Sequence, residues 1–151
     1  MYWISRIRSA YILLTAILIW LIPLSTIAAT PVKVIFDTDI SSDVDDVGAV
    51  AVLHALANQG KVDILAMMVS SGDPWSGPCL DVLNTWFGRP GIPIGLIKKP
   101  TVTHESKYTK EIASTYPHDV RRAVNASDAV DLYRQVLASQ PDNSVIIITV
   151  G

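Results

Sequence analysis

Four short apolar runs recur along the chain, each bounded by polar or turn-forming residues. Runs of this length that are apolar at nearly every position are typical of strands buried on both faces of a sheet. The predicted strands are residues 32–36, 62–69, 92–97 and 144–150. We expect the last strand to be buried like the others, because most of its residues are valine and isoleucine.

Helical patterns fill most of the intervals between these strands. The first is apolar on nearly all sides, the second has proline in its first turn and glycine at its end, and the third is amphipathic. These predicted helices are residues 47–57, 77–88 and 126–138. Residues 98–125 are polar without a sustained period, so we expect an irregular excursion there with a single helical turn.

This alternation predicts the fold class. Buried strands alternating with helices favour an α/β, Rossmann-like open sheet that is mostly parallel and carries helices on both faces. In such sheets, ligands bind beyond the carboxyl ends of the strands. Because the sequence ends directly after a predicted strand, we interpret residues 30–151 as the amino-terminal portion of a domain truncated before its carboxy-terminal half.

Residues 1–29 have the pattern of a secretory signal peptide. Basic residues precede an apolar run at 12–24, and small residues follow it up to Ala29. The alternative is a retained membrane anchor, but the run is shorter than the ~20 apolar residues of a spanning helix, and Pro23 interrupts its end. We therefore expect a secreted or periplasmic protein without stable membrane association after signal cleavage.

Charge is nearly balanced over the chain but is concentrated in one segment. The formal net charge is −2, and the absence of basic blocks argues against nucleic-acid binding. The only cysteine, Cys79, excludes an intrachain disulfide and is typical of a small core residue. Residues 36–46 read FDTDISSDVDD and contain five aspartates, namely Asp37, Asp39, Asp43, Asp45 and Asp46.

These aspartates repel one another, more strongly where water is excluded, so something must offset the repulsion. A solvated loop explains two of them, because a helix N-terminus favours carboxylates such as Asp45 and Asp46 by about 0.3–1 kcal/mol each. An EF-hand calcium loop does not fit, because its glycine and glutamate positions hold Ser42 and Gly48.

A third interpretation rests on D-x-D at the end of the first strand. Asp37-Thr38-Asp39 resembles the motif of haloacid-dehalogenase-type phosphatases, in which the first aspartate is the nucleophile beside Mg²⁺. This three-residue pattern leaves the other three aspartates of the segment unexplained.

The whole segment resembles the amino-terminal motif of the inosine–uridine nucleoside hydrolases, D-T-D-P-G-x-D-D-A. Residues 37–47 read DTDISSDVDDV, with two extra residues before the aspartate pair and no Pro-Gly. Residues 71–73 (SGD) lie where the family has Gly-Asn, residues 92–95 (IPIG) resemble its third strand, and residues 148–151 (ITVG) resemble the opening of its T-G-P-L-T-N segment. The resemblance covers residues 33–151.

The resemblance implies Ca²⁺-dependent hydrolysis of the N-glycosidic bond of ribonucleosides or a related N-riboside. It implies that Asp39 is the catalytic base and a metal ligand. Asp46 and the backbone carbonyl of Val150 are expected to bind Ca²⁺ as well, a hard cation that takes oxygen ligands. Asp45 and Asp73 are expected to bind the substrate.

Two aspartates are assigned supporting or alternative roles. Asp37 is expected to orient the loop, and Asp43 replaces Asp45 if the longer loop bulges differently. The family supplies another metal ligand and a leaving-group acid from its carboxy-terminal half, so this fragment is expected to be incomplete for activity. The expected partner is a small nucleoside or ribosyl substrate, with a homo-oligomer as an option. A secreted ribose- or calcium-binding relative without catalysis is the non-enzymatic alternative.

Outside this motif, the aromatic side chains of interest are Trp75 and the three histidines. Trp75 is interpreted as a platform for a nucleobase or as local packing. His54 lies in an apolar helix pattern and is interpreted as structural, whereas His104 and His118 lie in the polar excursion, where loop residues can carry function.

Overall fold

The computed structural model describes residues 29–99, 102, 105–119 and 126–151. The predicted signal peptide therefore lies outside the described residues, apart from Ala29. Within the part that is described, no helix is both long enough and apolar enough to cross a membrane.

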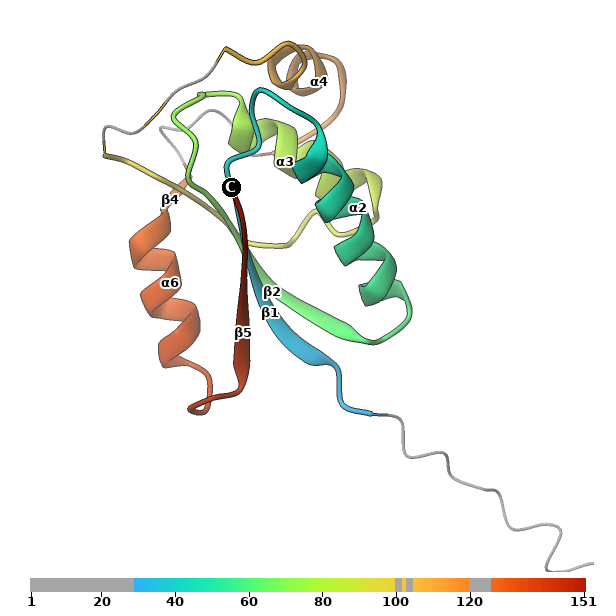
Figure 1. Ribbon diagram of the computed structural model, residues 1–151, viewed down its shortest axis with the longest axis vertical. Coiled ribbons are helices and arrows are strands. Elements are labelled where there is room, and N and C mark those ends of the chain that lie inside the picture. Colours follow the sequence, from blue (N-terminus) through green and yellow to red (C-terminus); the bar gives the residue numbers. More distant parts are fainter. Residues whose placement is uncertain (1–28, 100–101, 103–104, 120–125) are drawn as a thin grey trace, which may run out of the picture.

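The described strands form a single parallel sheet (Figure 1). Its spatial order is β4-β3-β2-β1-β5, so β1 lies between β2 and β5, and β4 and β5 are the two edge strands. The strands are β1 (Val32–Thr38), β2 (Val62–Val69), β3 (Ile94–Leu96), β4 (Ser127–Asp128) and β5 (Val145–Val150). The predicted α/β open sheet is confirmed.

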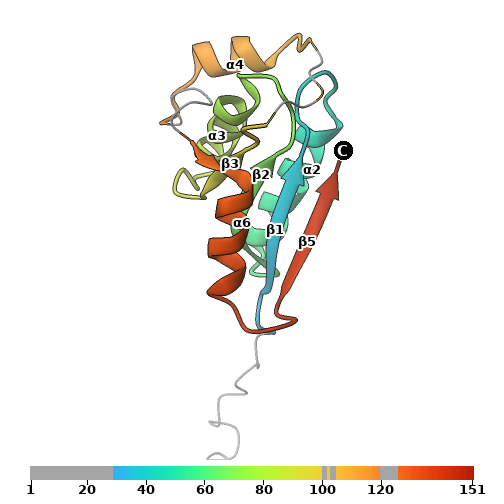
Figure 2. The same ribbon diagram turned by 90° about the vertical axis from the view of Figure 1, so that its left-hand side faces the viewer.

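Helices cover both faces of this sheet. Figures 1 and 2 show α2 and α3 on one side of the strands and α6 on the other, with α4 near the carboxyl ends of the strands. The helices are α2 (Asp45–Asn58), α3 (Ser76–Trp86), α4 (Thr109–Thr115) and α6 (Ala129–Ala138).

Successive side chains of β1 point to opposite faces of the sheet, so the strand contributes to a hydrophobic core on each face. Val34 and Phe36 pack with residues of α2 and α3, whereas Ile35 packs with Leu132 of α6. All of these side chains are at least nine-tenths buried. The same alternation continues to the end of β1, so that Asp37 lies on the α6 face and Thr38 on the α2 face.

The connections place a switch point beside β1. From β1 the chain moves through β2 and β3 to β4, and α6 then returns it to β5 on the other side of β1. In open α/β sheets, ligands bind where neighbouring strands lead away in opposite directions, at their carboxyl ends. This point lies between the ends of β1 and β5.

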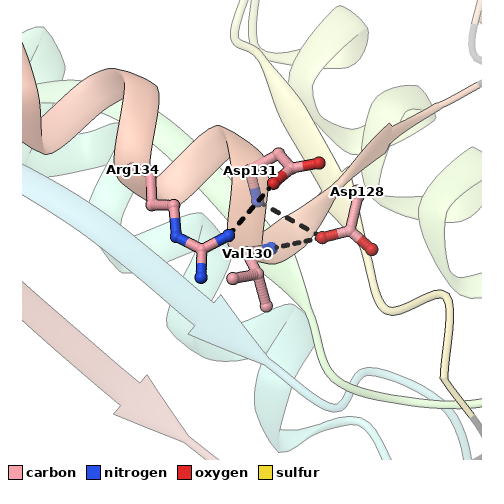
Figure 3. A network of polar contacts seen from close by, with 4 residues as sticks. All are labelled: Asp128, Val130, Asp131 and Arg134. Atoms are coloured by element: carbon pink, nitrogen blue, oxygen red, sulfur yellow. Dashed lines mark hydrogen bonds and ion pairs between the residues drawn. The ribbon is translucent and has the colours of Figure 1, made fainter.

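Three predicted segments differ most from the structure. The strand expected at 92–97 is limited to Ile94–Leu96, and the excursion contains α4, which has seven residues rather than a single turn. The helix expected at 126–138 begins at Ala129 because Asp128 caps it (Figure 3). The Asp128 carboxylate accepts hydrogen bonds from the backbone N–H groups of Val130 (2.8 Å) and Asp131 (3.2 Å). Ser127 and the capping residue Asp128 extend the sheet as β4.

The prediction of a buried last strand was also wrong. β5 pairs with β1 on one side only, and Ile146 and Ile147 are 53% and 47% exposed. An apolar run indicates that a strand can be buried, but it does not say what covers the strand. Within the described residues, no helix covers the outer part of β5.

Candidate active site

The loop after β1 meets the end of β5 at the carboxyl edge of the sheet. Thr38 is paired in register with Val150, the residue whose carbonyl was predicted to bind metal. Gly151 follows with φ +141°, and a β-carbon placed on it would come within 2.6 Å of Asp39 Oδ1. The close approach requires glycine here and brings the Asp39 carboxylate against the end of β5.

Three of the five aspartates form a compact cluster beside this junction. Ligand atoms of Asp43, Asp45 and Asp46 all lie within 4.8 Å of one another. Asp45 and Asp46 occupy the first turn of α2, where the helix dipole favours negative charge. Asp43 and Asp45 are exposed, whereas Asp46 is only 2% exposed. The cluster therefore contains two solvent-exposed carboxylates and one buried carboxylate.

The D-T-D segment (residues 37–39) holds Asp46 through a hydrogen bond from Thr38. The Thr38 hydroxyl donates a hydrogen bond to Asp46 Oδ1, and the backbone N–H of Ile40 donates to Thr38 Oγ1 (3.1 Å). Burial raises the pKa of Asp46 to about 6; the Thr38 hydrogen bond opposes this shift, and the charges of Asp39, Asp45 and Asp43 add to it. A cation at the cluster would counter both causes of the rise.

The chemistry of the donor set fits a hard divalent cation. Ca²⁺ takes carboxylate and carbonyl oxygens, and the cluster presents carboxylates with no cationic side chain bonded to them within the described residues. The three grouped residues differ in part from the predicted set. Asp43 joins Asp45 and Asp46, whereas the alternative predicted from the longer loop was that Asp43 replaces Asp45. Asp39 is outside this group but lies near enough to raise the pKa of Asp46.

Asp73, predicted to bind substrate, is engaged inside the protein. Its Oδ1 accepts a hydrogen bond from the Trp75 backbone N–H (3.0 Å). Its Oδ2 accepts one from the Thr109 hydroxyl (2.6 Å) and a longer one from Ser76 Oγ (3.5 Å). The carboxylate thus holds the start of α3 and the start of α4 together.

Asp37 lies on the other face of the sheet from Asp46. Its Oδ2 accepts a hydrogen bond from the Tyr133 hydroxyl of α6 (2.7 Å). Burial, followed by this hydrogen bond, raises the pKa of Tyr133. The contact joins α6 to the end of β1.

Sequence reasoning did not find Thr38, Ser76 and Tyr108 as parts of the site. Ser76 Oγ donates to the Ile40 carbonyl, and the Tyr108 hydroxyl donates to the Asp43 carbonyl (2.6 Å). The strand period does identify Thr38, because it shares a face with Phe36. No local pattern identifies the other two, since their partners lie 36 and 65 residues away in the chain.

Among the remaining aromatic candidates, His54 is a structural residue. His54 is fully buried, contacts Asn84 through Nε2 (2.9 Å) and stacks on Phe87 with 4.6 Å between ring centroids. Burial lowers its pKa, as expected for a neutral core histidine. The ring of Trp75 has the Lys110 ammonium 6.0 Å from its centroid. His104 lies outside the described residues.

Comparisons with known proteins bear on the fold. No protein-family model matches the chain, and no curated protein sequence matches it either. A solved structure titled "Crystal structure of the effector protein XOO4466" is similar, with a TM-score of 0.57 and 17% sequence identity. The match covers 80% of this chain and 36% of that one, so this chain spans little more than a third of the length of that protein. The similarity supports the α/β open sheet.

Proposed function

We propose that the full-length protein hydrolyses the N-glycosidic bond of ribonucleosides, or of a related N-riboside, in a Ca²⁺-dependent reaction. The observation that carries the proposal is the gathering of Asp39 and the cluster Asp43, Asp45 and Asp46 at the switch point of a parallel sheet. The resemblance of residues 37–47 to the nucleoside hydrolase motif supports the choice of reaction.

The calcium ligands in this proposal come from the acidic cluster. Asp46 and Asp45 would hold the ion from the first turn of α2, and Asp43 would hold it from the loop. The Val150 carbonyl completes the described part of the site from the end of β5. When bound, the ion lowers the pKa of a coordinated water and holds the ribose hydroxyls.

Asp39 acts as the general base in this mechanism. It follows β1 directly, is exposed to solvent and lies against Gly151, so its carboxylate faces the region where β1 and β5 end. It takes the proton of the attacking water as the anomeric carbon develops oxocarbenium character. Asp45 is exposed and accepts hydrogen bonds from ribose hydroxyls.

The contacts of Asp73 and Asp37 sharpen the proposal. Asp73 already accepts hydrogen bonds at both oxygens, so we assign it to holding the loops instead of direct substrate binding. A phosphatase mechanism needs Asp37 as nucleophile, but Asp37 lies on the α6 face and accepts the Tyr133 hydroxyl. The Asp37 contact favours the hydrolase over the phosphatase.

The deciding experiment measures ribose release by the purified full-length protein from a panel of purine and pyrimidine nucleosides, with Ca²⁺ and with a chelator. Wild type should release ribose only with Ca²⁺. Asp39→Asn should lower kcat by at least about 10³-fold without loss of fold. Asp63→Asn is the matched control, because Asp63 is exposed near the amino end of β2. No release from any nucleoside under either condition refutes the proposal.

A further inference from the structure

Tyr108 lies just before α4, and Thr109 is the first residue of α4. Their hydroxyl groups contact the loops that follow β1 and β2. The Tyr108 hydroxyl donates to the Asp43 carbonyl, and the Thr109 hydroxyl donates to the Asp73 carboxylate, both at 2.6 Å. Figure 2 shows α4 lying across the carboxyl end of the sheet. A single short segment therefore joins both loops of the candidate site.

The outer end of the loop that bears Asp43 is tied to α2 by a backbone hydrogen bond, from the Gly48 N–H to the Val44 carbonyl (3.1 Å). Ser42, Asp43 and Val44 are all exposed. The inner end is fixed by Ser76, which donates to the Ile40 carbonyl. Among the described residues, only the Tyr108 hydroxyl forms a side-chain hydrogen bond from another element to residues 42–44. The Tyr108 bond therefore adds a fixed point at Asp43 itself, one residue before the N-cap of α2.

Tyr108 is itself well fixed. Its backbone N–H donates to Ser106 Oγ (3.3 Å), and the neighbouring Thr109 is 1% exposed and bonded to Asp73. The partner of the Tyr108 hydroxyl is a backbone carbonyl, which can only accept, so the hydroxyl is the donor of this bond. A fixed donor can hold a loop whose own carboxylates repel one another.

We propose that Tyr108 is a positioning residue that holds Asp43 beside Asp45 and Asp46, so that the segment leading into α4 sets the affinity of the cluster for a divalent cation. The identity of the cation as Ca²⁺ rests on the proposed function. The tether between Tyr108 and the loop does not depend on it.

The test compares Tyr108→Phe with Tyr116→Phe in the full-length protein. Both changes remove one phenol hydroxyl, and Tyr116 lies at the other end of α4, 46% exposed. Without Ca²⁺, hydrogen–deuterium exchange in residues 40–46 should rise in Tyr108→Phe only. Calorimetric titration with CaCl₂ should then give an affinity about five- to tenfold weaker for Tyr108→Phe, the loss expected for one hydrogen bond.

The outcomes separate the two proposals. Unchanged exchange in residues 40–46 of Tyr108→Phe overturns the tether, and so does an equal rise in both variants. Faster exchange with unchanged Ca²⁺ affinity overturns the positioning role. If wild type binds no Ca²⁺ but Tyr108→Phe still frees the loop, the proposed calcium chemistry fails and the tether is supported.

Discussion

The loops after β1 and β2 both bring aspartates to the carboxyl edge of the sheet, but they use them in opposite ways. Asp73, after β2, accepts hydrogen bonds from the Trp75 N–H and the Thr109 hydroxyl. Asp43 and Asp45, after β1, are exposed, and their carboxylates accept no hydrogen bond within the described part of the chain. A carboxylate surrounded by donors stabilises the fold, whereas carboxylates surrounded by like charge are available for a ligand.

Asp46 combines both situations. It is buried and accepts the Thr38 hydroxyl, as Asp73 accepts the Thr109 hydroxyl, yet three like charges act on it. Hydrogen bonding stabilises its charged form, and burial with repulsion destabilises it. The rise of its pKa to about 6 indicates that the destabilising causes are larger in the absence of a cation.

The largest effect is expected from removing the exposed charges of the first loop. The double variant Asp43→Asn/Asp45→Asn should weaken Ca²⁺ binding by about 100-fold or more, because it removes two charged ligands. Its stability without Ca²⁺ should be unchanged or slightly higher, since repulsion is relieved. Calorimetry and thermal unfolding measure the two effects. Undiminished Ca²⁺ affinity would show that the ion binds elsewhere.

The next largest effect is a pH dependence caused by Asp46. Folding raises the pKa of this carboxyl from 3.8 to about 6, so the folded state binds its proton more tightly. Its favourable contribution is complete below pH 4 and is lost as the pH rises through 6, by about 3 kcal/mol at most. Urea unfolding of wild type and Asp46→Asn in a chelator, from pH 4 to 7, should show this loss in wild type only. Parallel curves for the two proteins would contradict it.

Removing the engaged carboxylate of the second loop should lower stability. Asp73→Ala leaves the buried Thr109 hydroxyl and the Trp75 N–H without their acceptor, which should cost about 2–3 kcal/mol in the free energy of unfolding. Ca²⁺ affinity should fall much less than in the first-loop variant. The measurements are urea unfolding and calorimetry. A stability equal to wild type would place Asp73 with the ligand-binding aspartates instead.

The smallest effect is expected at Thr38. Thr38→Val keeps the shape of the side chain but removes the hydroxyl that donates to Asp46, which should cost about 1 kcal/mol at neutral pH. Because that bond lowers the pKa of Asp46, the pH at which stability is lost should move upward. Repeating the urea series with this variant measures both changes. If the pH at which stability is lost moved downward instead, the Thr38 hydrogen bond would favour the protonated form of Asp46.

Much of the fold was predictable from apolar periodicity. Residues 62–69 were predicted as a strand with the bounds that β2 has, and the helix predicted at 47–57 lies within α2. These elements depend on contacts repeated every two to four residues, which the local sequence records. The short α4 was missed because its stability comes from contacts with other elements. The exposure of β5 was missed because apolar composition does not say what covers a strand.

For the candidate site, the sequence by itself determined the residue types and their shared edge: aspartates after β1, Ser-Gly-Asp after β2 and glycine after β5 must meet when the strands are parallel. Only the tertiary structure decided how each carboxylate is used. Asp73 is bonded to α4 and Asp37 to α6, while Asp43, Asp45 and Asp46 gather together. The reason is that the partner donors, Thr109 and Tyr133, lie 36 and 96 residues away, and folding alone brings them there.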